Sequence, residues 1–237
     1  MRKDLVTEYD LEGEDFALIF TRARELKHFL KEGRPHPVLA GKTLGMIFEK
    51  ASTRTRLSFE VGMYQLGGLA VFLNTKDTQL GRGETVADTA RIMSRYLDGI
   101  MIRTFAQQTV EDLARHATIP VINGLTDLLH PCQILSDLFT IMEKKGRYEG
   151  LKIAYVGDGN NVANSWINAA ARLPLKLALA CPEGYDPDSQ VLSRGQQEAR
   201  EGIALYRDPK EAIADADVVY TDVWASMGQE EEKETRA

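Results

Sequence analysis

Strand-like and helix-like segments alternate along almost the whole chain, and this alternation restricts the possible folds most strongly. Short apolar runs are each followed by a longer segment with apolar residues at helical spacing. We expect strands at 43–48, 70–73, 99–103, 120–123, 151–156, 175–180, 203–206 and 218–221. Helices are expected at 13–33, 53–66, 84–97, 109–116, 131–145, 161–172, 188–201 and 209–214. Such alternation predicts an α/β protein with parallel sheets and covering helices.

The pattern restarts after Gly146 and Gly150, which predicts two successive α/β domains. We place the first domain at 1–130, a linking helix at 131–147 and the second domain at 148–237. The second domain is expected to be Rossmann-like and incomplete at its C-terminus. A chain of 237 residues is long enough to bury two modest cores.

Composition excludes several classes of function. A net charge of −6 argues against a nucleic-acid-binding surface, and no apolar run is long enough to span a bilayer. The first ten residues contain three acidic side chains and no apolar core, unlike a signal or transit peptide. Cys132 and Cys181 are too few for a disulfide framework or a cysteine metal site. We therefore expect a soluble, cytoplasmic protein that binds neither nucleic acid nor membrane.

A phosphate site is predicted where the strand 43–48 meets its helix. The connection carries two hydroxyl residues and two arginines in the run Ser52-Thr53-Arg54-Thr55-Arg56. Ser and Thr are good N-terminal caps, and a helix start offers unpaired N–H groups and the positive end of the dipole. Arg adds a planar fork that matches phosphate oxygens. The alternative is an ordinary capped helix with solvated arginines, and we interpret Arg56, which faces another way than Arg54, as structural.

A second glycine-containing turn, Gly157-Asp158-Gly159, follows the strand 151–156 and opens a helix, as in a dinucleotide site. Val162 stands where the third glycine of that fingerprint belongs, and the acidic residue expected one strand later is absent. A nucleotide-dependent oxidoreductase is therefore disfavoured. Asn161 fits an amino-acid site better, because its amide can hydrogen-bond a carboxylate or an ammonium group.

The Ser-Thr-Arg-Thr-Arg run after a strand resembles the carbamoyl-phosphate loop of the transcarbamylases, and the resemblance covers nearly the whole chain. Further matches are His130-Pro131-Cys132-Gln133, the run Gly157–Ser165 and the run Asp222–Gly228. The last two runs are similar to the ornithine-type members, and Ser-Met-Gly after Asp-x-Trp discriminates most. Members of this family continue past Ala237 with a His-Cys-Leu-Pro loop, a later Arg and a closing helix.

The resemblance implies two α/β domains and a site for carbamoyl phosphate. It assigns the phosphate cradle to Ser52, Thr53, Arg54 and Thr55. It makes Arg103, His130 and Gln133 the catalytic residues: Arg103 bridges phosphate and carbonyl oxygen, His130 contacts that oxygen and Gln133 contacts the carbamoyl NH2. Gln79 would reach the phosphate of a neighbouring subunit, which implies a homotrimer or a multiple of it.

The same resemblance implies an L-ornithine site formed by Asn161, Asp222, Ser226 and Met227. The implied reaction transfers the carbamoyl group to the side-chain amine of ornithine and gives citrulline and phosphate, a step of arginine metabolism. No metal or organic cofactor is implied, and we reject Cys132 as a nucleophile because carbamoyl phosphate is already activated. Two alternatives stay open: another amino-acid acceptor, aspartate or acetylornithine, and a chain that binds carbamoyl phosphate without turnover.

Overall fold

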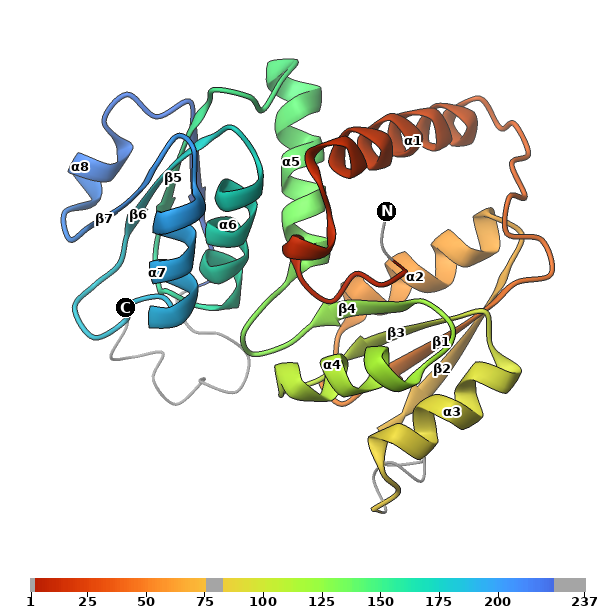
Figure 1. Cartoon of the computed structure of the whole chain (residues 1–237). Helices are drawn as coiled ribbons and strands as arrows, with labels where there is room; N and C mark the ends of the chain where they lie inside the picture. Colours follow the sequence, from red (N-terminus) through yellow and green to blue (C-terminus); the bar gives the residue numbers. More distant parts are fainter. Residues whose placement is uncertain (1–2, 76–82, 224–237) are drawn as a thin grey trace. The chain divides into compact units, whose positions relative to one another are not determined.

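The structure is a computed structural model that describes residues 3–75 and 83–223, and Figure 1 shows its elements in sequence colours. The chain divides into two compact units, Met1–Asp127 and Leu128–Ala237. Each unit contains a four-stranded parallel sheet and covering helices, which confirms the predicted α/β class. The helix expected to link the two domains lies within the second unit. No helix in the described part of the chain is long and apolar enough to cross a bilayer.

The first unit carries a sheet with the strand order β2-β1-β3-β4. Its elements are η1 (Glu8–Asp10), α1 (Gly13–Lys31), β1 (Thr43–Phe48), α2 (Thr53–Gln65), β2 (Leu69–Asn74), α3 (Val86–Tyr96), β3 (Gly99–Arg103), α4 (Gln107–His116) and β4 (Val121–Leu125). Side chains alternate across the strands, so Ile47 and Met46 of β1 belong to two different core clusters. Helices α3 and α4 contribute to the Ile47 cluster, and α2 contributes to the Met46 cluster.

The second unit has the strand order β7-β6-β5-β8. Its elements are α5 (Pro131–Lys145), β5 (Lys152–Val156), α6 (Asn161–Arg172), β6 (Lys176–Ala180), α7 (Ser189–Glu198), β7 (Ile203–Tyr206), α8 (Pro209–Ile213) and β8 (Val218–Thr221). Every residue of α6 from Val162 to Ala170 is buried, because this helix packs against α5, α7 and β6. Trp166 of α6 meets the ring of Tyr220 edge-on at 5.6 Å, and Tyr155 stacks on Tyr220 at 5.8 Å.

Most predicted element boundaries are confirmed to within two residues; the largest difference is in α7, which ends at Glu198, three residues before the predicted end at 201. The expected helix 84–97 begins two residues later, at Val86, because Thr85 is its cap and accepts a hydrogen bond from the Asp88 amide. Strand β4 continues through Gly124 to Leu125, beyond the predicted end at residue 123. A Cβ on Gly124 would lie 2.6 Å from the sulfur of Met101, so this glycine permits close packing and does not end the strand.

Both sheets reverse their strand order once, and the reversals decide where ligands can bind. The first sheet reverses between β1 and β3, and the second reverses between β5 and β8. Connections leave such neighbouring strands in opposite directions, which opens a crevice at their carboxyl ends. The fold therefore indicates two ligand-binding positions: the turn after β1 beside Arg103 and the turn after β5 beside Asp222.

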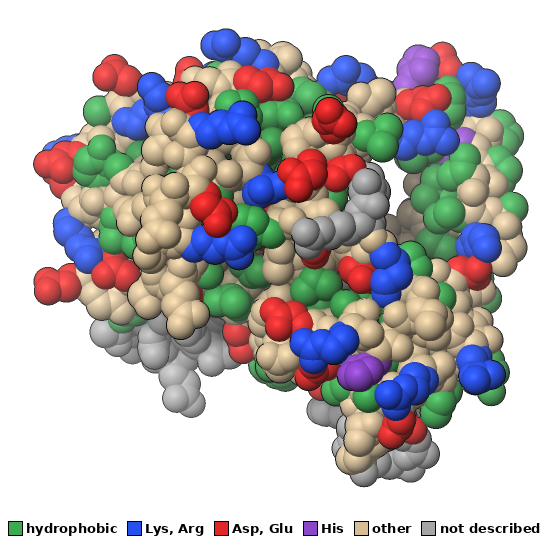
Figure 2. All heavy atoms as spheres, viewed as in Figure 1, with side chains coloured by type: hydrophobic (Ala, Val, Ile, Leu, Met, Phe, Trp, Pro, Cys, Tyr) green, Lys and Arg blue, Asp and Glu red, His purple; other side chains and the backbone are tan. Residues whose placement is uncertain are grey.

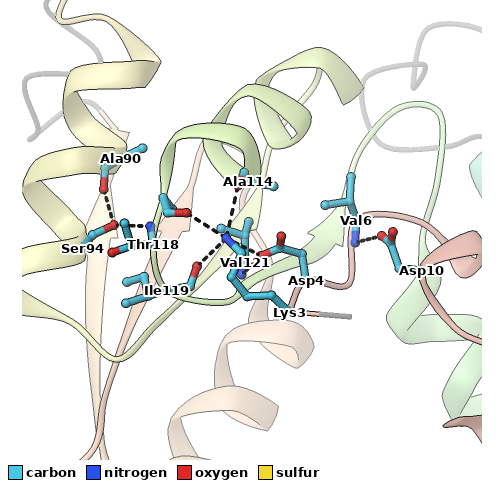
Figure 3. A network of polar contacts seen from close by, with 11 residues as sticks. Lys3, Asp4, Val6, Asp10, Ala90, Ser94, Ala114, Thr118, Ile119 and Val121 are labelled. Carbon is cyan, nitrogen blue, oxygen red and sulfur yellow. Dashed lines mark hydrogen bonds and ion pairs between the residues drawn. The ribbon is translucent and has the colours of Figure 1, made fainter. Parts of the chain in front are cut away.

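The N-terminal segment adds a short parallel bridge beside β4. The Leu5 amide donates to the Val121 carbonyl at 2.9 Å, and the Asn123 amide donates to the Leu5 carbonyl at 2.8 Å. Figure 3 shows the Lys3 side chain reaching the end of α4, where its ammonium donates to three carbonyls, of Ala114, Ala117 and Ile119, at 3.2, 2.8 and 3.2 Å. A cation here also complements the negative end of the α4 dipole.

We expect Lys3→Met to lower the free energy of unfolding by about 1–2 kcal/mol, because it removes a charged donor from carbonyls at a helix end. Thermal unfolding of the variant and of the unchanged protein measures the loss. Lys176→Met, at an exposed lysine on β6, is the matched control and should leave the unfolding midpoint in place. Equal shifts in the two variants would contradict the role given to Lys3.

Candidate functional site

The turn between β1 and α2 has the capped geometry that the sequence predicts. Ser52 has an extended backbone and is the N-cap of α2, and its hydroxyl accepts a hydrogen bond from the Thr55 amide at 3.2 Å. Thr53 is the first residue of the helix, and both Thr53 and Arg54 are exposed. The unpaired N–H groups of a helix start and the two exposed polar side chains make this end of α2 suited to an anion.

Arg103 brings a buried positive charge to the same end of the sheet. It closes β3 and lies in register with Phe48, the last residue of β1. Its side chain is only 5% exposed, and one guanidinium nitrogen donates to the Thr55 hydroxyl at 3.3 Å. Burial, and then the charge of Arg54, lower the pKa of Arg103. An anion bound between these two like charges would offset their repulsion.

Arg56 differs from Arg54 although only one residue separates them. Its Nε donates to the Glu60 carboxylate at 2.9 Å, and its guanidinium lies 3.8 Å from the centre of the Phe72 ring. The side chain therefore ties α2 to β2 and does not join Arg103. This arrangement agrees with the structural interpretation of Arg56.

Two residues that the sequence analysis did not single out hold the turn in place. Lys50 forms an ion pair with Asp127 and lies over the ring of Phe105, 4.6 Å from its centre. The Glu49 carboxylate accepts a hydrogen bond from the Thr104 hydroxyl. Their position along the chain offered a signal for this role, because charged residues directly after a buried strand usually need a partner. Their partners lie more than fifty residues away and could not be read from the sequence.

In the second unit, buried polar residues of α6 fix the loop that carries His130. The His130 amide donates to the Ser165 hydroxyl at 2.8 Å, and the Asn164 side chain donates to the Leu128 carbonyl at 3.1 Å. His130 is the N-cap of α5, with Pro131 in the first turn as predicted. Asn164 and Ser165 belong to the run Gly157–Ser165 that is similar to the ornithine-type members, and neither was predicted to have a role of its own. Their contacts position the His130 backbone.

At the crevice between β5 and β8, Asp222 is hydrogen-bonded to Asn160, the neighbour of the predicted ornithine-binding residue Asn161. Asn160 donates to the Asp222 carboxylate at 2.8 Å, and its side-chain oxygen accepts from the Val162 amide as the cap of α6. Asn161 follows as the first helical residue. The role of Asn160 as cap and partner of Asp222 was not predicted from the sequence, where only Asn161 was given a role.

Gln133 has a close carboxylate partner on its own helix. Its side-chain nitrogen donates to Asp137, one turn further along α5, at 3.0 Å. Burial is the largest cause of a raised pKa for Asp137 and the Asp222 charge also raises it, while the hydrogen bond from Gln133 and the nearby Tyr220 hydroxyl lower it. Asp137 is therefore bonded to a residue assigned to the carbamoyl group and is affected by the charge of one assigned to ornithine. Asp137 was not predicted as a site residue, although its i+4 spacing from Gln133 can be read from the sequence.

The glycine turn after β5 has no room for a pyrophosphate at its second glycine. The Gly159 amide donates to the Tyr185 carbonyl at 2.8 Å. A Cβ on Gly159 would overlap the backbone of Asp186 and Pro187. The chain itself occupies the space that a dinucleotide fingerprint leaves for its ligand. This packing agrees with the interpretation that the turn is not a dinucleotide site.

Several predicted features lie elsewhere or give no site. Gln79, Ser226 and Met227 are outside the described residues. Within residues 3–75 and 83–223 no three His, Cys, Asp or Glu side chains are grouped to hold a metal ion. Burial raises the pKa of the Cys181 thiol to about 12, so this cysteine is not a thiolate at neutral pH. On the face shown in Figure 2, acidic and basic side chains are interspersed and form no basic stripe.

Comparison with protein families assigns both halves of the chain. Residues 3–143 match the carbamoyl-P binding domain of aspartate/ornithine carbamoyltransferases, and residues 149–237 match their Asp/Orn binding domain. The chain belongs to the aspartate/ornithine carbamoyltransferase family. This membership confirms the family predicted from the sequence motifs, while the roles of individual residues in the carbamoyltransferase site remain predictions.

Individual relatives agree with this family membership. The ornithine carbamoyltransferase of Syntrophus aciditrophicus is 73% identical over 237 residues, which are 100% of this chain and 78% of the relative. That of Geobacter metallireducens is 58% identical over 98% of this chain and 76% of its own length. The solved ornithine carbamoyltransferase of Pyrococcus furiosus has a TM-score of 0.93 at 54% identity, over 99% of this chain and 76% of that one.

Gly159→Ala should lower the free energy of unfolding by at least about 1–3 kcal/mol, because a methyl group here forces the 185–187 backbone away. Gly62→Ala is the matched control: Gly62 lies in α2 and a Cβ there has nothing within 4 Å. Alanine should stabilise that helix by about 0.5–1 kcal/mol. Chemical unfolding measures both changes. An unchanged free energy of unfolding in Gly159→Ala would contradict the close packing of Gly159 against the 185–187 backbone.

Proposed function

We propose that the chain is an ornithine carbamoyltransferase, which transfers the carbamoyl group of carbamoyl phosphate to the side-chain amine of L-ornithine. The products are citrulline and phosphate. The main supporting observation is the combination of a capped helix start, the exposed Arg54 and the buried Arg103 at the point where the first sheet reverses its strand order. This combination favours a phosphate, and family membership gives the chemistry of the phosphate compound.

Binding of the phosphate group is assigned to Ser52, Thr53, Arg54 and Thr55. Thr55 is well suited to connect the cradle with Arg103, since its hydroxyl accepts from that guanidinium and its amide donates to Ser52. The positive charge of Arg54 and Arg103 also stabilises the phosphate dianion as it leaves. We assign Arg103 a second contact, to the carbonyl oxygen of the carbamoyl group.

The carbamoyl group is assigned to His130 and Gln133. When the amine attacks, negative charge develops on the carbonyl oxygen, and donors from Arg103 and His130 stabilise it. The side-chain oxygen of Gln133 accepts from the carbamoyl NH2 and orients the carbonyl carbon toward the amine. His130 receives a defined position from Ser165, which supports this role.

Ornithine is assigned to the crevice between β5 and β8. The Asp222 carboxylate is exposed and accepts well from an ammonium group, and the amide of Asn161 provides a further polar contact. Ser226 and Met227 complete the predicted ornithine set. Asn160 joins it as the residue that orients Asp222. The attacking amine must lose its proton before it reacts, because a free alkyl amine is charged at neutral pH.

We further propose that the enzyme acts in arginine metabolism in the cytoplasm as a homotrimer or a multiple of it, with Gln79 reaching the phosphate of a neighbouring subunit. An exposed apolar stripe on α2 supports association: Leu57, Val61 and Tyr64 are 53, 46 and 81% exposed. Large apolar side chains at helical spacing on one face are typical of a subunit contact.

Citrulline formation by the purified chain tests the proposal. The assay supplies carbamoyl phosphate together with ornithine, and runs aspartate and acetylornithine as parallel acceptors. Product formation with ornithine, and with neither of the other two acceptors, would establish the reaction. Product formation with aspartate or acetylornithine would show that the acceptor is not the proposed one. Binding of carbamoyl phosphate without any product would favour the non-catalytic alternative.

Arg54→Ala should abolish detectable carbamoyl-phosphate binding, because it removes a charged donor from the cradle; one such hydrogen bond contributes about 1.5–3 kcal/mol. Titration calorimetry measures the affinity. Arg56→Ala is the matched control, since the Arg56 side chain is engaged with Glu60 and Phe72, and it should bind with nearly unchanged affinity. Wild-type affinity in Arg54→Ala would contradict the phosphate assignment.

Asp222→Asn should weaken ornithine binding about tenfold or more while carbamoyl-phosphate binding stays unchanged. The substituted amide keeps an oxygen that can accept from Asn160, so the loop geometry is preserved while the negative charge is lost. Calorimetric titration with each substrate separates the two effects. An equal loss for both substrates would contradict the division of roles between Asp222 and the phosphate cradle.

A further inference from the structure

The role proposed for Gln133 requires one orientation of its side-chain amide, and the amide alone does not fix that orientation. A primary amide has an accepting oxygen at one end and a donating NH2 at the other. Rotation by half a turn exchanges the two ends with almost no change in shape. To accept from the carbamoyl NH2, the amide must present its oxygen to the ligand. A neighbouring group must therefore fix which end of the Gln133 amide faces the ligand.

Asp137 is placed to fix the orientation of the Gln133 amide. Its Oδ1 lies 3.0 Å from the Gln133 side-chain nitrogen, at helical i+4 spacing on α5. An ionised carboxylate only accepts hydrogen bonds, so the NH2 end of the amide is the end that can face it. With the nitrogen so engaged, the oxygen of Gln133 is directed away from Asp137 and is left for another donor.

Tyr220, from the sheet of the same unit, lies next to Asp137. Its hydroxyl on β8 is close to the Asp137 carboxylate. Tyr220 cannot easily move, because its ring stacks on Tyr155 with an angle of 18° between the planes and meets Trp166 edge-on. Tyr155 and Trp166 are both fully buried. The carboxylate thus accepts from Gln133 on its own helix and lies near a hydroxyl whose ring is held in place.

We propose that Asp137 is a positioning residue that fixes the Gln133 amide with its oxygen toward the carbamoyl NH2, and so gives the site its preference for a carbamoyl over an acyl group. This inference rests on the proposed function. An acyl group places a methyl where carbamoyl has NH2, and a methyl cannot donate to the Gln133 oxygen. Without Asp137, the amide can turn its NH2 end to the ligand, and the preference is lost.

Two stable ligands measure this preference directly. Phosphonoacetamide carries a terminal NH2, whereas acetonylphosphonate has the same shape with a methyl in its place. Titration calorimetry gives the ratio of their dissociation constants. We expect the unchanged protein to favour phosphonoacetamide, and Asp137→Asn to reduce the ratio about tenfold or more, as for loss of a hydrogen bond to a charged group.

Matched variants separate positioning from a general structural role. Glu143→Gln neutralises an exposed carboxylate on the same helix and should keep the ratio. Gln133→Ala should lose the preference, and adding Asp137→Asn to it should change the ratio no further, because the two residues act through one amide. Tyr220→Phe keeps the ring and removes the hydroxyl, and should lower the ratio about two- to tenfold.

An unchanged ratio in Asp137→Asn, or equal weakening of both ligands, would overturn the inference. Should Asp137→Asn fail to fold, an unchanged ratio in Tyr220→Phe would overturn it instead. A different result bears on the underlying function: if the unchanged protein binds neither phosphonate, the carbamoyl-phosphate site itself is wrong.

Discussion

The packing of parallel strands around a reversal of strand order determines where chemistry can occur in this protein. In each sheet the carboxyl ends of the strands lie at one edge, and the reversal opens a crevice there. The first sheet presents a helix start and Arg103 at its crevice, and the second presents Asp222 and the cap of α6. The two units thus provide an anion-binding end and an acidic end from one architecture, which suits an anionic donor and a cationic acceptor.

Much of this organisation could be predicted from the sequence, because it depends on local patterns. Apolar periodicity located the helices and strands, and Ser52 identified itself as a cap by its place before an apolar helical run. Family motifs then indicated the ligands. Contacts between distant segments could not be predicted, since periodicity carries no information on partners. Asn160 and Asp222 are 62 residues apart, and only the folded sheet brings them within a hydrogen bond.

Neighbouring residues of one type also take different roles, for reasons that the sequence does not contain. Arg54 and Arg56 differ because α2 turns between them: the charge of Arg54 acts on Arg103, whereas Arg56 lies over the ring of Phe72 on β2. Asn160 and Asn161 differ because the first precedes the helix and the second begins it. Helical geometry predicts the difference within the first pair, whereas the difference within the second depends on the exact start of the helix.

The complete burial of α6 has a consequence for how this sequence can change over time. Most helices have a solvent side on which substitutions are nearly neutral, but nine consecutive residues of α6 have none. Its polar members are committed as well, since Asn164 and Ser165 hold the loop before α5. A change of volume or polarity in α6 needs a matching change in α5, α7 or the sheet, so this helix drifts only together with its surroundings.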